Sequence, residues 1–441
     1  MTPREAAFVS LQKYENNKKF ANIEADTAIR RNGLEGADRA LYTAIFYGTI
    51  ERKITLDYLI DRLSARKPGD IDANVRIILR LSLYQMKYLD RVPDYAILDE
   101  AGELCKRFAA KSAVAFVNAV LRAYRRQEND IRFPDRKTDT TGYLSVTYSY
   151  PDWLCQLWLD SYGYNKTEAI FRAFEDNPPI TLRVNTLKTT TEELLTALKA
   201  KTIGAKETAN VSNGIRLSCH CPIEEIPGFS EGLWFVQDEA SQIAVSVLDP
   251  HPGETVIDAC ACPGGKSFST ALWMENAGTL RSYDLHKNKL KLVTEGAEKL
   301  GISILEAKEQ NGAVFVPELE NSADRVLCDV PCSGLGVLSK KPDIRHKQAD
   351  EITRLPAIQY AILDNCSRYV KPGGTLVYST CTLNPAENEN NVTKFLSEHP
   401  DFHVVPVHIG ARIAESGMLT IFPDEFPGCD GFFVSKMEKL Q

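Results

Sequence analysis

Apolar side chains recur every three to four positions through the first 127 residues of the chain. The spacing is clear in ALYTAIFYGTIERKITLDYLIDRL and VRIILRLSLYQMKYLD, and no convincing stretch alternates apolar with polar residues. A period of 3.6 residues places such side chains on one face of a helix. We therefore predict an all-α bundle, which ends at the polar linker ENDIRFPDRKTDTTG.

The pattern becomes mixed after this linker. PDWLCQLWLDSYGYNKTEAIFRAFEDN predicts two helices, ITLRVNTL a strand, and TTEELLTALKAKTI a helix whose preceding threonines are suited to capping. These elements predict a small α+β segment.

From about residue 234, short apolar strands alternate with amphipathic helices. The predicted strands are TVIDAC, TLRSYDL, ISILEA, RVLCDV and TLVYSTC. Strands joined by crossover helices form a mostly parallel sheet with helices on both faces, so we predict an α/β, Rossmann-like domain. The expected domains are residues 1–130, 145–233 and 234–441.

Composition adds a cellular context. The chain is 44% hydrophobic and 25% charged, and it contains no apolar run of the roughly 20 residues that a membrane helix requires. Eleven scattered cysteines favour reduced thiols over a disulfide framework. We expect a monomeric cytoplasmic protein without membrane or metal partners.

Charge is distributed unevenly along the chain. Residues 1–140 carry a net charge of +5, whereas the remainder carries −12. The basic excess of the predicted bundle is a candidate nucleic-acid footprint, although a solvated surface would explain it equally well.

A glycine-bearing loop follows the first strand of the predicted sheet, where open α/β sheets bind their ligands. A phosphate-binding P-loop would require glycine at position 260, which is cysteine, and the motif G-x-G-x-x-G is absent. The alternative reading is a tight strand-to-helix turn. The loop residues are Cys260, Ala261, Cys262, Pro263, Gly264, Gly265, Lys266 and Ser267.

Acidic and thiol side chains lie at the ends of three further strands. Asp284 ends the second strand, where a carboxylate can accept hydrogen bonds from a ribose or cap the next helix. Asp329 precedes Cys332 at the end of the fourth strand, and Cys381 follows the fifth. Adjacent strand ends would bring both thiols to one crevice, although a lone thiol is more often a small buried hydrophobe.

These motifs carry a family resemblance. DACACPGGKS, LCDVPCSGLGVLSKKPDIR, YSTCTLNPAENE and GCDGFF resemble the NOL1/NOP2/Sun family of RNA cytosine-5 methyltransferases. Residues 1–130, with LRLSLYQMKYLDRVPDYAILDEAGELCKRF and FVNAVLR, resemble the NusB RNA-binding fold. This order of modules is similar to that of bacterial 16S rRNA methyltransferases, which implies small-subunit ribosomal RNA as the partner.

The resemblance also implies residue roles. The loop from Cys260 to Lys266, together with Asp284 and Asp329, would contact S-adenosylmethionine, and Lys266 would help to order the site. Cys381 would attack the base and Cys332 would assist product release. Gln237 and Asp238 are expected within the helix before the first strand, as scaffold.

Two positions depart from the family pattern. Gln310-Asn311-Gly312 replaces a Gly-Asp-Gly, so the cofactor contact expected at Asn311 would come from an amide. His346 stands where relatives tend to have tryptophan after Pro-Asp-Ile-Arg, which weakens any inference about stacking there.

Three rival functions remain open from the sequence. A DNA cytosine methyltransferase would use the thiol of its Pro-Cys motif, here Cys332, and would leave Cys381 without a role. A metal or redox protein would draw on Cys219-His220-Cys221 and Cys260-x-Cys262, but Cys-x-x-Cys pairs are absent. A non-catalytic RNA-binding scaffold would not require both thiols.

Overall fold

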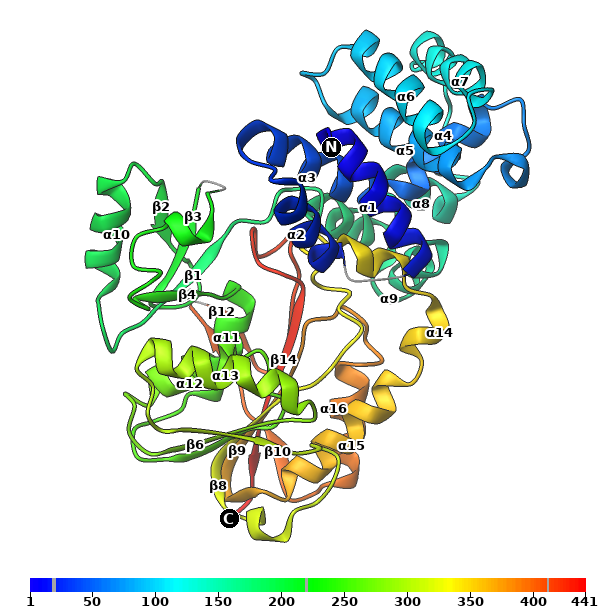
Figure 1. Ribbon diagram of the computed structural model, residues 1–441. Helices are drawn as coiled ribbons and strands as arrows, with labels where there is room; N and C mark the ends of the chain where they lie inside the picture. Colours follow the sequence, from blue (N-terminus) through cyan, green and yellow to red (C-terminus); the bar gives the residue numbers. More distant parts are fainter. Residues whose placement is uncertain (18–20, 219–220, 411) are drawn as a thin grey trace. The chain divides into compact units, whose positions relative to one another are not determined.

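The computed structural model describes residues 1–17, 21–218, 221–410 and 412–441 (Figure 1). The chain forms two compact units, one of Met1–Glu175 with Leu338–Lys347 and one of Asp176–Val337 with Gln348–Gln441.

The first unit is helical, as the apolar period predicts. Its core contains Phe8, Phe46, Ile78 and Leu121, all fully buried. The Asp72 side chain accepts hydrogen bonds from two backbone N–H groups at the start of α5 and so caps that helix. The helices are α1 (Pro3–Asn17), α2 (Ala21–Asn32), α3 (Gly36–Glu51), α4 (Lys53–Leu63), η1 (Pro68–Asp70), α5 (Ala73–Tyr88), α6 (Asp94–Phe108), α7 (Ala113–Gln127), α8 (Thr140–Tyr148), α9 (Asp152–Ala173) and η4 (Pro342–His346).

Helix α9 contains the two helices predicted for this stretch. Gly163 lies between them with φ of 73° and ψ of 169°, a conformation that glycine adopts without steric cost. The prediction of two helices is therefore confirmed.

The second unit begins with a small antiparallel sheet of order β2-β3-β1-β4. Thr190 and Glu193 form a capping box at the start of α10, which confirms the predicted threonine cap. Leu182 and Val184 of β1 are fully buried with Leu194 and Leu198 of α10 in one apolar cluster. The elements are β1 (Thr181–Val184), α10 (Thr191–Ala200), β2 (Ala205–Glu207), β3 (Gly214–Leu217), η2 (Ile223–Glu225) and β4 (Trp234–Val236).

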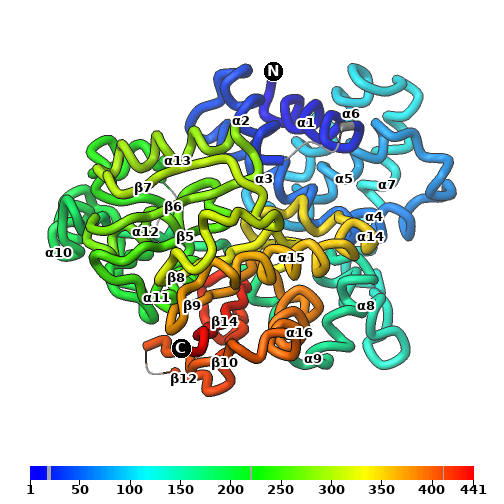
Figure 2. Tube along the Cα trace, turned by 90° about the horizontal axis from the view of Figure 1, so that it is seen from below, coloured from blue at the N-terminus to red at the C-terminus, as the bar shows by residue number. Residues whose placement is uncertain are grey.

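A larger sheet of order β10-β14-β9-β8-β5-β6-β7 follows, with β13 paired to β14 (Figure 2). Strands β5 to β9 run parallel, and β14 joins them antiparallel to β9. The predicted Rossmann-like sheet is thus present. Its strands are β5 (Thr255–Asp258), β6 (Thr279–Asp284), β7 (Leu305–Glu309), β8 (Ala323–Asp329), β9 (Val370–Thr380), β10 (Phe402–Val404), β13 (Met418–Ile421) and β14 (Phe432–Lys439), with a separate pair β11 (Val407–Ile409) and β12 (Arg412–Ala414).

Helices cover both faces of this sheet. One apolar cluster joins the sheet to α11, α12 and α13, and another joins it to α15 and α16. Both faces are therefore dry, which leaves the strand ends as the place for polar chemistry. The helices are α11 (Glu239–Leu248), α12 (Gly265–Trp273), α13 (Lys287–Leu300), η3 (Pro317–Leu319), α14 (Ala349–Ile352), α15 (Leu355–Ser367) and α16 (Glu389–Glu398).

Candidate active site

The glycine-bearing loop connects β5 to α12. The Gly264 N–H donates to the Ala261 carbonyl oxygen at 2.7 Å, and the Ala261 N–H donates to the Tyr283 carbonyl oxygen on β6 at 2.7 Å. Gly264 has a φ of 116°, and a Cβ there would lie 2.4 Å from the Phe268 ring. Only glycine therefore fits this turn, which exposes backbone ahead of the N-terminus of α12.

Asp284 ends β6 beside this loop. Its carboxylate accepts hydrogen bonds from the Cys262 N–H at 3.3 Å and the His286 N–H at 2.9 Å. The side chain thus ties the second strand to the loop. Because the residue is only half-buried, the remaining acceptor capacity of its carboxylate is available to a ligand.

The loop thiols belong to the apolar clusters. Cys260 packs against the cluster of α15, and burial raises the pKa of its thiol well above the usual range. Cys262 packs against the cluster of α12, and burial together with Asp284 raises its pKa to about 12. Neutral, partly buried thiols are poor nucleophiles, so the chemistry lies elsewhere.

Lys266 lies in the first turn of α12 and pairs with Asp329 at the end of β8. The ammonium nitrogen is 2.7 Å from a carboxylate oxygen of Asp329. Ser379 donates to the other carboxylate oxygen at 2.9 Å. Burial alone would lower the pKa of Lys266, but Asp329 and Cys381 outweigh it, and the pKa is raised. The site therefore holds a charged ammonium group near the Cys381 thiol.

The two predicted thiols meet at the ends of adjacent parallel strands. Asp329 of β8 lies opposite Ser379 of β9, and Cys332 and Cys381 follow these positions. The Sγ atoms of Cys332 and Cys381 are 3.1 Å apart, within hydrogen-bonding distance. The contact with Cys381, followed by burial, raises the pKa of Cys332 well above its usual range. The neutral thiol is therefore the favoured form of Cys332.

Asn311 is exposed beyond the end of β7, where its side chain accepts the Ala313 N–H at 3.0 Å. The N–H of the preceding residue, Gln310, donates to the Asp284 carbonyl oxygen at 3.0 Å, so Asn311 follows a residue that is bonded to the end of β6. The expectation that Gln237 and Asp238 lie within a helix is wrong, because α11 begins at Glu239 and Asp238 caps it.

Gln237 supports the loop in a way that the sequence analysis missed. Its amide nitrogen donates to the Gly265 carbonyl oxygen at 3.0 Å, and its amide oxygen accepts from the Ser269 hydroxyl at 2.6 Å. Asp258 was also missed. It accepts from the Ser267 hydroxyl at 2.6 Å, and burial raises its pKa to about 6 although that hydrogen bond lowers it.

A buried polar network lies behind the two thiols and was missed as well. The polar run NPAENEN after Thr382 was the available signal. The buried side chains of this network are Gln359, Asn384, Glu387, Asn388 and Asn391.

Among the described residues, no group of three or more His, Cys, Asp or Glu side chains is arranged to hold a metal ion. No helix in this part of the chain is both long and apolar enough to span a membrane. Cys219 and His220 of the metal alternative lie outside the described residues.

A Rossmann-like sheet with a glycine loop after its first strand and a carboxylate at the end of the next defines a class, the S-adenosylmethionine-dependent methyltransferases. The donor set fits that cofactor, because loop backbone, Asp284 and the cradle at Gly264 offer hydrogen bonds without a phosphate-binding signature. Family models agree along the chain: NusB family at residues 1–126, the ferredoxin-like domain of RsmF/B-like methyltransferases at 150–224, and 16S rRNA methyltransferase RsmB/F at 245–438.

Individual relatives cover nearly the whole chain. The probable ribosomal RNA small subunit methyltransferase B of Bacillus subtilis is 39% identical over 99% of this chain and 98% of its own. That of Synechocystis is 36% identical over the full length of both. The crystal structure of PH0851 matches with a TM-score of 0.82 and 28% identity over 100% of this chain and 99% of its own. The chain therefore belongs to the ribosomal RNA small subunit methyltransferase B family, which confirms the family resemblance.

Proposed function

We propose that the protein transfers a methyl group from S-adenosylmethionine to carbon 5 of a cytosine in small-subunit ribosomal RNA, through a covalent bond between Cys381 and the base. The observation that carries this proposal is the pair of thiols 3.1 Å apart at adjacent strand ends, next to the charged Lys266. A methyltransferase that acted on a ring nitrogen or a ribose oxygen would have no use for two thiols.

Carbon 5 of cytosine is a weak nucleophile, and thiolate addition activates it. The Cys381 sulfur forms a bond to carbon 6, and the electron pair of the 5,6 double bond becomes available at carbon 5. S-adenosylmethionine, when bound, would supply the electrophilic methyl group that carbon 5 takes, and the electron pair of the broken sulfur–methyl bond would remain on its sulfur. Water accepts the proton from carbon 5, the 5,6 double bond re-forms, and the bond from sulfur to carbon 6 breaks with its electron pair returning to Cys381.

The surrounding residues divide the supporting work. The Lys266 ammonium favours the thiolate form of Cys381 through its positive charge. Cys332, held as a thiol, donates a hydrogen bond to the Cys381 sulfur and assists its departure from carbon 6. We infer that Asp329, fixed by Lys266 and Ser379, accepts a hydrogen bond from the base near nitrogen 3 in the adduct, where that nitrogen carries a proton.

Cofactor contacts in this proposal come from the loop Cys260–Lys266, Asp284 and Asp329, with Asn311 at the outer end of the sheet. The RNA substrate is supported by the names of the relatives, ribosomal RNA small subunit methyltransferase B. We propose that residues 1–130, 145–233 and 234–441 divide the roles, with RNA binding in the first and second domains and chemistry in the third.

Two cysteine variants test the mechanism. We expect Cys381→Ala to abolish methylation and to form no covalent adduct with RNA, because the proposal assigns the attack on carbon 6 to the Cys381 sulfur. We expect the Cys332→Ala variant to add to the base and to methylate it, but to release the RNA slowly. A protein–RNA adduct should therefore accumulate and survive denaturing electrophoresis. Cys221→Ala serves as a matched control away from the site.

Chemical mapping of methylated bases in ribosomal RNA identifies the product. Products other than 5-methylcytosine would exclude the proposed reaction. The reversed pattern, with adduct in Cys381→Ala and none in an inactive Cys332→Ala, would make Cys332 the nucleophile, as in the DNA-type alternative.

A further inference from the structure

Two consecutive residues, Glu387 and Asn388, reach the turns that carry the two thiols. Both side chains are fully buried, and they lie just before α16. Each binds the chain on either side of a cysteine. We call this pair the clamp.

Asn388 holds the turn of Cys381. Its amide oxygen accepts from the Thr380 hydroxyl at 2.6 Å, and its amide nitrogen donates to the Thr382 carbonyl oxygen at 2.9 Å. These contacts flank Cys381 on both sides. An amide is required because one group must accept and the other must donate.

Glu387 holds the turn of Cys332 together with Gln359 of α15. A carboxylate oxygen of Glu387 accepts the Ser333 N–H at 2.9 Å and the Gln359 amide at 2.7 Å. The same Gln359 amide donates to the Pro331 carbonyl oxygen at 2.9 Å. Pro331 and Ser333 flank Cys332, so this turn is also fixed on both sides.

The charge of Glu387 distinguishes the two thiols. Its other carboxylate oxygen accepts from the Asn384 amide at 2.9 Å, so the contacts of the carboxylate named here come from N–H donors, which suits its ionised form. After the contact with Cys381 and burial, the negative charge of Glu387 further raises the pKa of Cys332. The positive charge of Lys266 interacts with Cys381. The two thiols are therefore influenced by charges of opposite sign.

We propose that Glu387 and Asn388 are positioning residues with separate tasks: Asn388 sets the Cys381 sulfur for addition to carbon 6, and Glu387 keeps Cys332 as the thiol that assists release. The inference rests on the proposed function. It adds to that function a second layer of residues that assigns the two cysteines their different roles.

Isosteric variants separate the tasks. Asn388→Asp removes the donor to Thr382, so we expect single-turnover methylation and adduct formation to fall at least about tenfold. Glu387→Gln removes the charge and one acceptor. We expect its single-turnover methylation to stay within about threefold of the parent rate, because addition is intact. Its steady-state turnover should be at least about tenfold lower, and the adduct should accumulate.

The pH dependence of alkylation gives a readout that a purely structural role would not move. Removing an anion near a thiol lowers its pKa, so Glu387→Gln should shift the alkylation midpoint of Cys332 by iodoacetamide to lower pH. Mass spectrometry resolves Cys332 from the other cysteines. In Asn388→Asp, the alkylation midpoint of Cys332 should not move to lower pH.

Second variants and controls keep the test decisive. Gln359→Met releases the Cys332 turn from α15 but keeps the Glu387 charge, so it should slow release without shifting the alkylation midpoint of Cys332 to lower pH. Thr380→Val removes the hydroxyl bonded to Asn388 and should reproduce Asn388→Asp. Neighbouring Glu389→Gln, whose side chain bonds to Thr420, and the exposed Asn390→Ala should behave like the parent. Thermal unfolding and cofactor binding check that each variant is folded.

Equal losses of addition and release in Glu387→Gln and Asn388→Asp would show that the clamp is only structural. Slow release in Asn388→Asp together with lost addition in Glu387→Gln would show that the two roles are assigned to the wrong residues. Cys381→Ala and Cys332→Ala are measured in parallel. If Cys381→Ala still forms adduct, or if the product is not 5-methylcytosine, the proposed function fails whatever the clamp variants do. If those two behave as expected and the clamp variants do not separate, only the clamp inference fails.

Discussion

His346 occupies a position where a positive charge is unfavourable. Its Nε2 lies 2.7 Å from the Ile50 carbonyl oxygen, within the helical unit. Burial lowers the pKa of the ring to about 4, although the contact with Ile50 raises it, and Lys53 and Arg345 lower it further. The neutral ring donates to Ile50, so this histidine acts as a hydrogen-bonding packing residue in place of the tryptophan expected from relatives.

This histidine should make the helical unit sensitive to acid. Because an ordinary histidine has a pKa near 6.5, the unfolded chain binds more protons than the folded chain between about pH 6.5 and pH 4. The contribution of His346 is complete above this window and is lost as pH falls through it. We expect roughly 1 to 3 kcal/mol of the free energy of unfolding to depend on the protonation state of His346.

The measurement is denaturant unfolding of the helical unit at pH 7 and pH 5, followed for the parent and for His346→Gln. Glutamine keeps a donor for Ile50 but does not titrate, so its loss of stability between the two pH values should be smaller. His403→Gln, an exposed position on β10, is the control. Parallel losses in parent and His346→Gln would show that other groups cause the acid sensitivity.

At the scale of elements, residues 338–347 join the helical unit although they follow β8 of the large sheet in sequence. Arg345 of η4 anchors this segment. The side chain is fully buried, a guanidinium nitrogen lies 3.1 Å from a Glu51 carboxylate oxygen of α3, and the group stacks over the Tyr150 ring at 4.4 Å. A buried guanidinium is stable only while its partners remain in place.

Removing one partner of this pair should cost more than removing both. Glu51→Gln leaves the fully buried Arg345 guanidinium without its carboxylate, and we expect the helical unit to lose about 3 kcal/mol. The double variant Arg345→Met with Glu51→Gln should recover part of that loss, because no charge is left uncompensated. Hydrogen exchange of α3 and η4 reports the local change. Additive losses in the double variant would show that the pair is not energetically coupled.

Features that a short stretch of sequence determines could be predicted. Features that depend on contacts between residues far apart in the chain could not. The loop Cys260–Lys266 and the strand ends at Asp329 and Cys381 lie within short stretches of recognisable spacing. Their adjacency followed from the expected order of parallel strands. The role of Gln359 was not visible, because its partners Pro331 and Glu387 are each 28 residues away along the chain. Nor does any local pattern show that β14 pairs with β9 or that residues 338–347 pack with the N-terminal helices.

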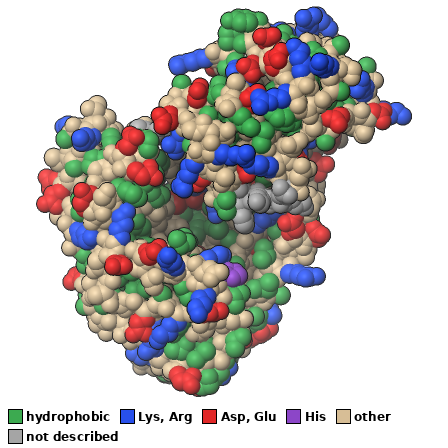
Figure 3. All heavy atoms as spheres, in the orientation of Figure 1, with side chains coloured by type: hydrophobic (Ala, Val, Ile, Leu, Met, Phe, Trp, Pro, Cys, Tyr) green, Lys and Arg blue, Asp and Glu red, His purple; other side chains and the backbone are tan. Residues whose placement is uncertain are grey.

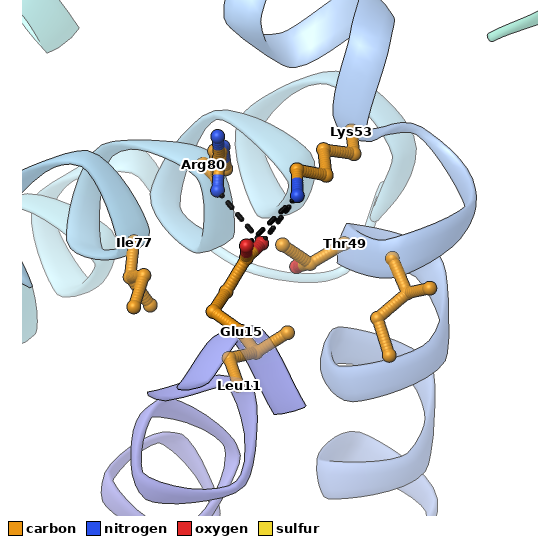
Figure 4. Close-up of a pocket in the computed structure, with 7 residues that line it drawn as sticks. Leu11, Glu15, Thr49, Lys53, Ile77 and Arg80 are labelled. Atoms are coloured by element: carbon orange, nitrogen blue, oxygen red, sulfur yellow. Dashed lines mark hydrogen bonds and ion pairs between the residues drawn. The ribbon is translucent and has the colours of Figure 1, made fainter. Parts of the chain in front are cut away.

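At the scale of the whole molecule, many basic side chains of the N-terminal region are paired with carboxylates within the fold. On the face shown in Figure 3, Lys and Arg side chains over the N-terminal helices are interspersed with Asp and Glu. Figure 4 shows Glu15 in a small pocket, with Lys53 at 2.7 Å and Arg80 at 3.0 Å. Arg125 likewise pairs with Asp94 and Glu128. Only some of the 25 Lys and Arg residues in positions 1–140 are therefore available to RNA.

Arg122 and Arg126 are the better candidates for RNA contacts. They lie one turn apart on α7, both are exposed, and no ion pair within the described part of the chain involves either of them. Neighbouring cations on one helical face can neutralise successive phosphates, and each phosphate contact releases a counterion. The sequence reading that treats the charge asymmetry as a solvated surface predicts no effect of these two residues on RNA.

Reversing both charges tests that difference. We expect Arg122→Glu with Arg126→Glu to weaken binding to small-subunit ribosomal RNA roughly tenfold at moderate salt and to flatten the salt dependence by about 1.4 in log–log slope, since single strands contribute about 0.7 per contact. Cofactor affinity should be unchanged. The double variant Lys308→Glu with Lys394→Glu reverses two exposed charges outside the helical unit and reaches the same net charge, so it controls for overall repulsion. Equal weakening by both double variants would mean that RNA senses only the net charge, and α7 would then carry no specific contact.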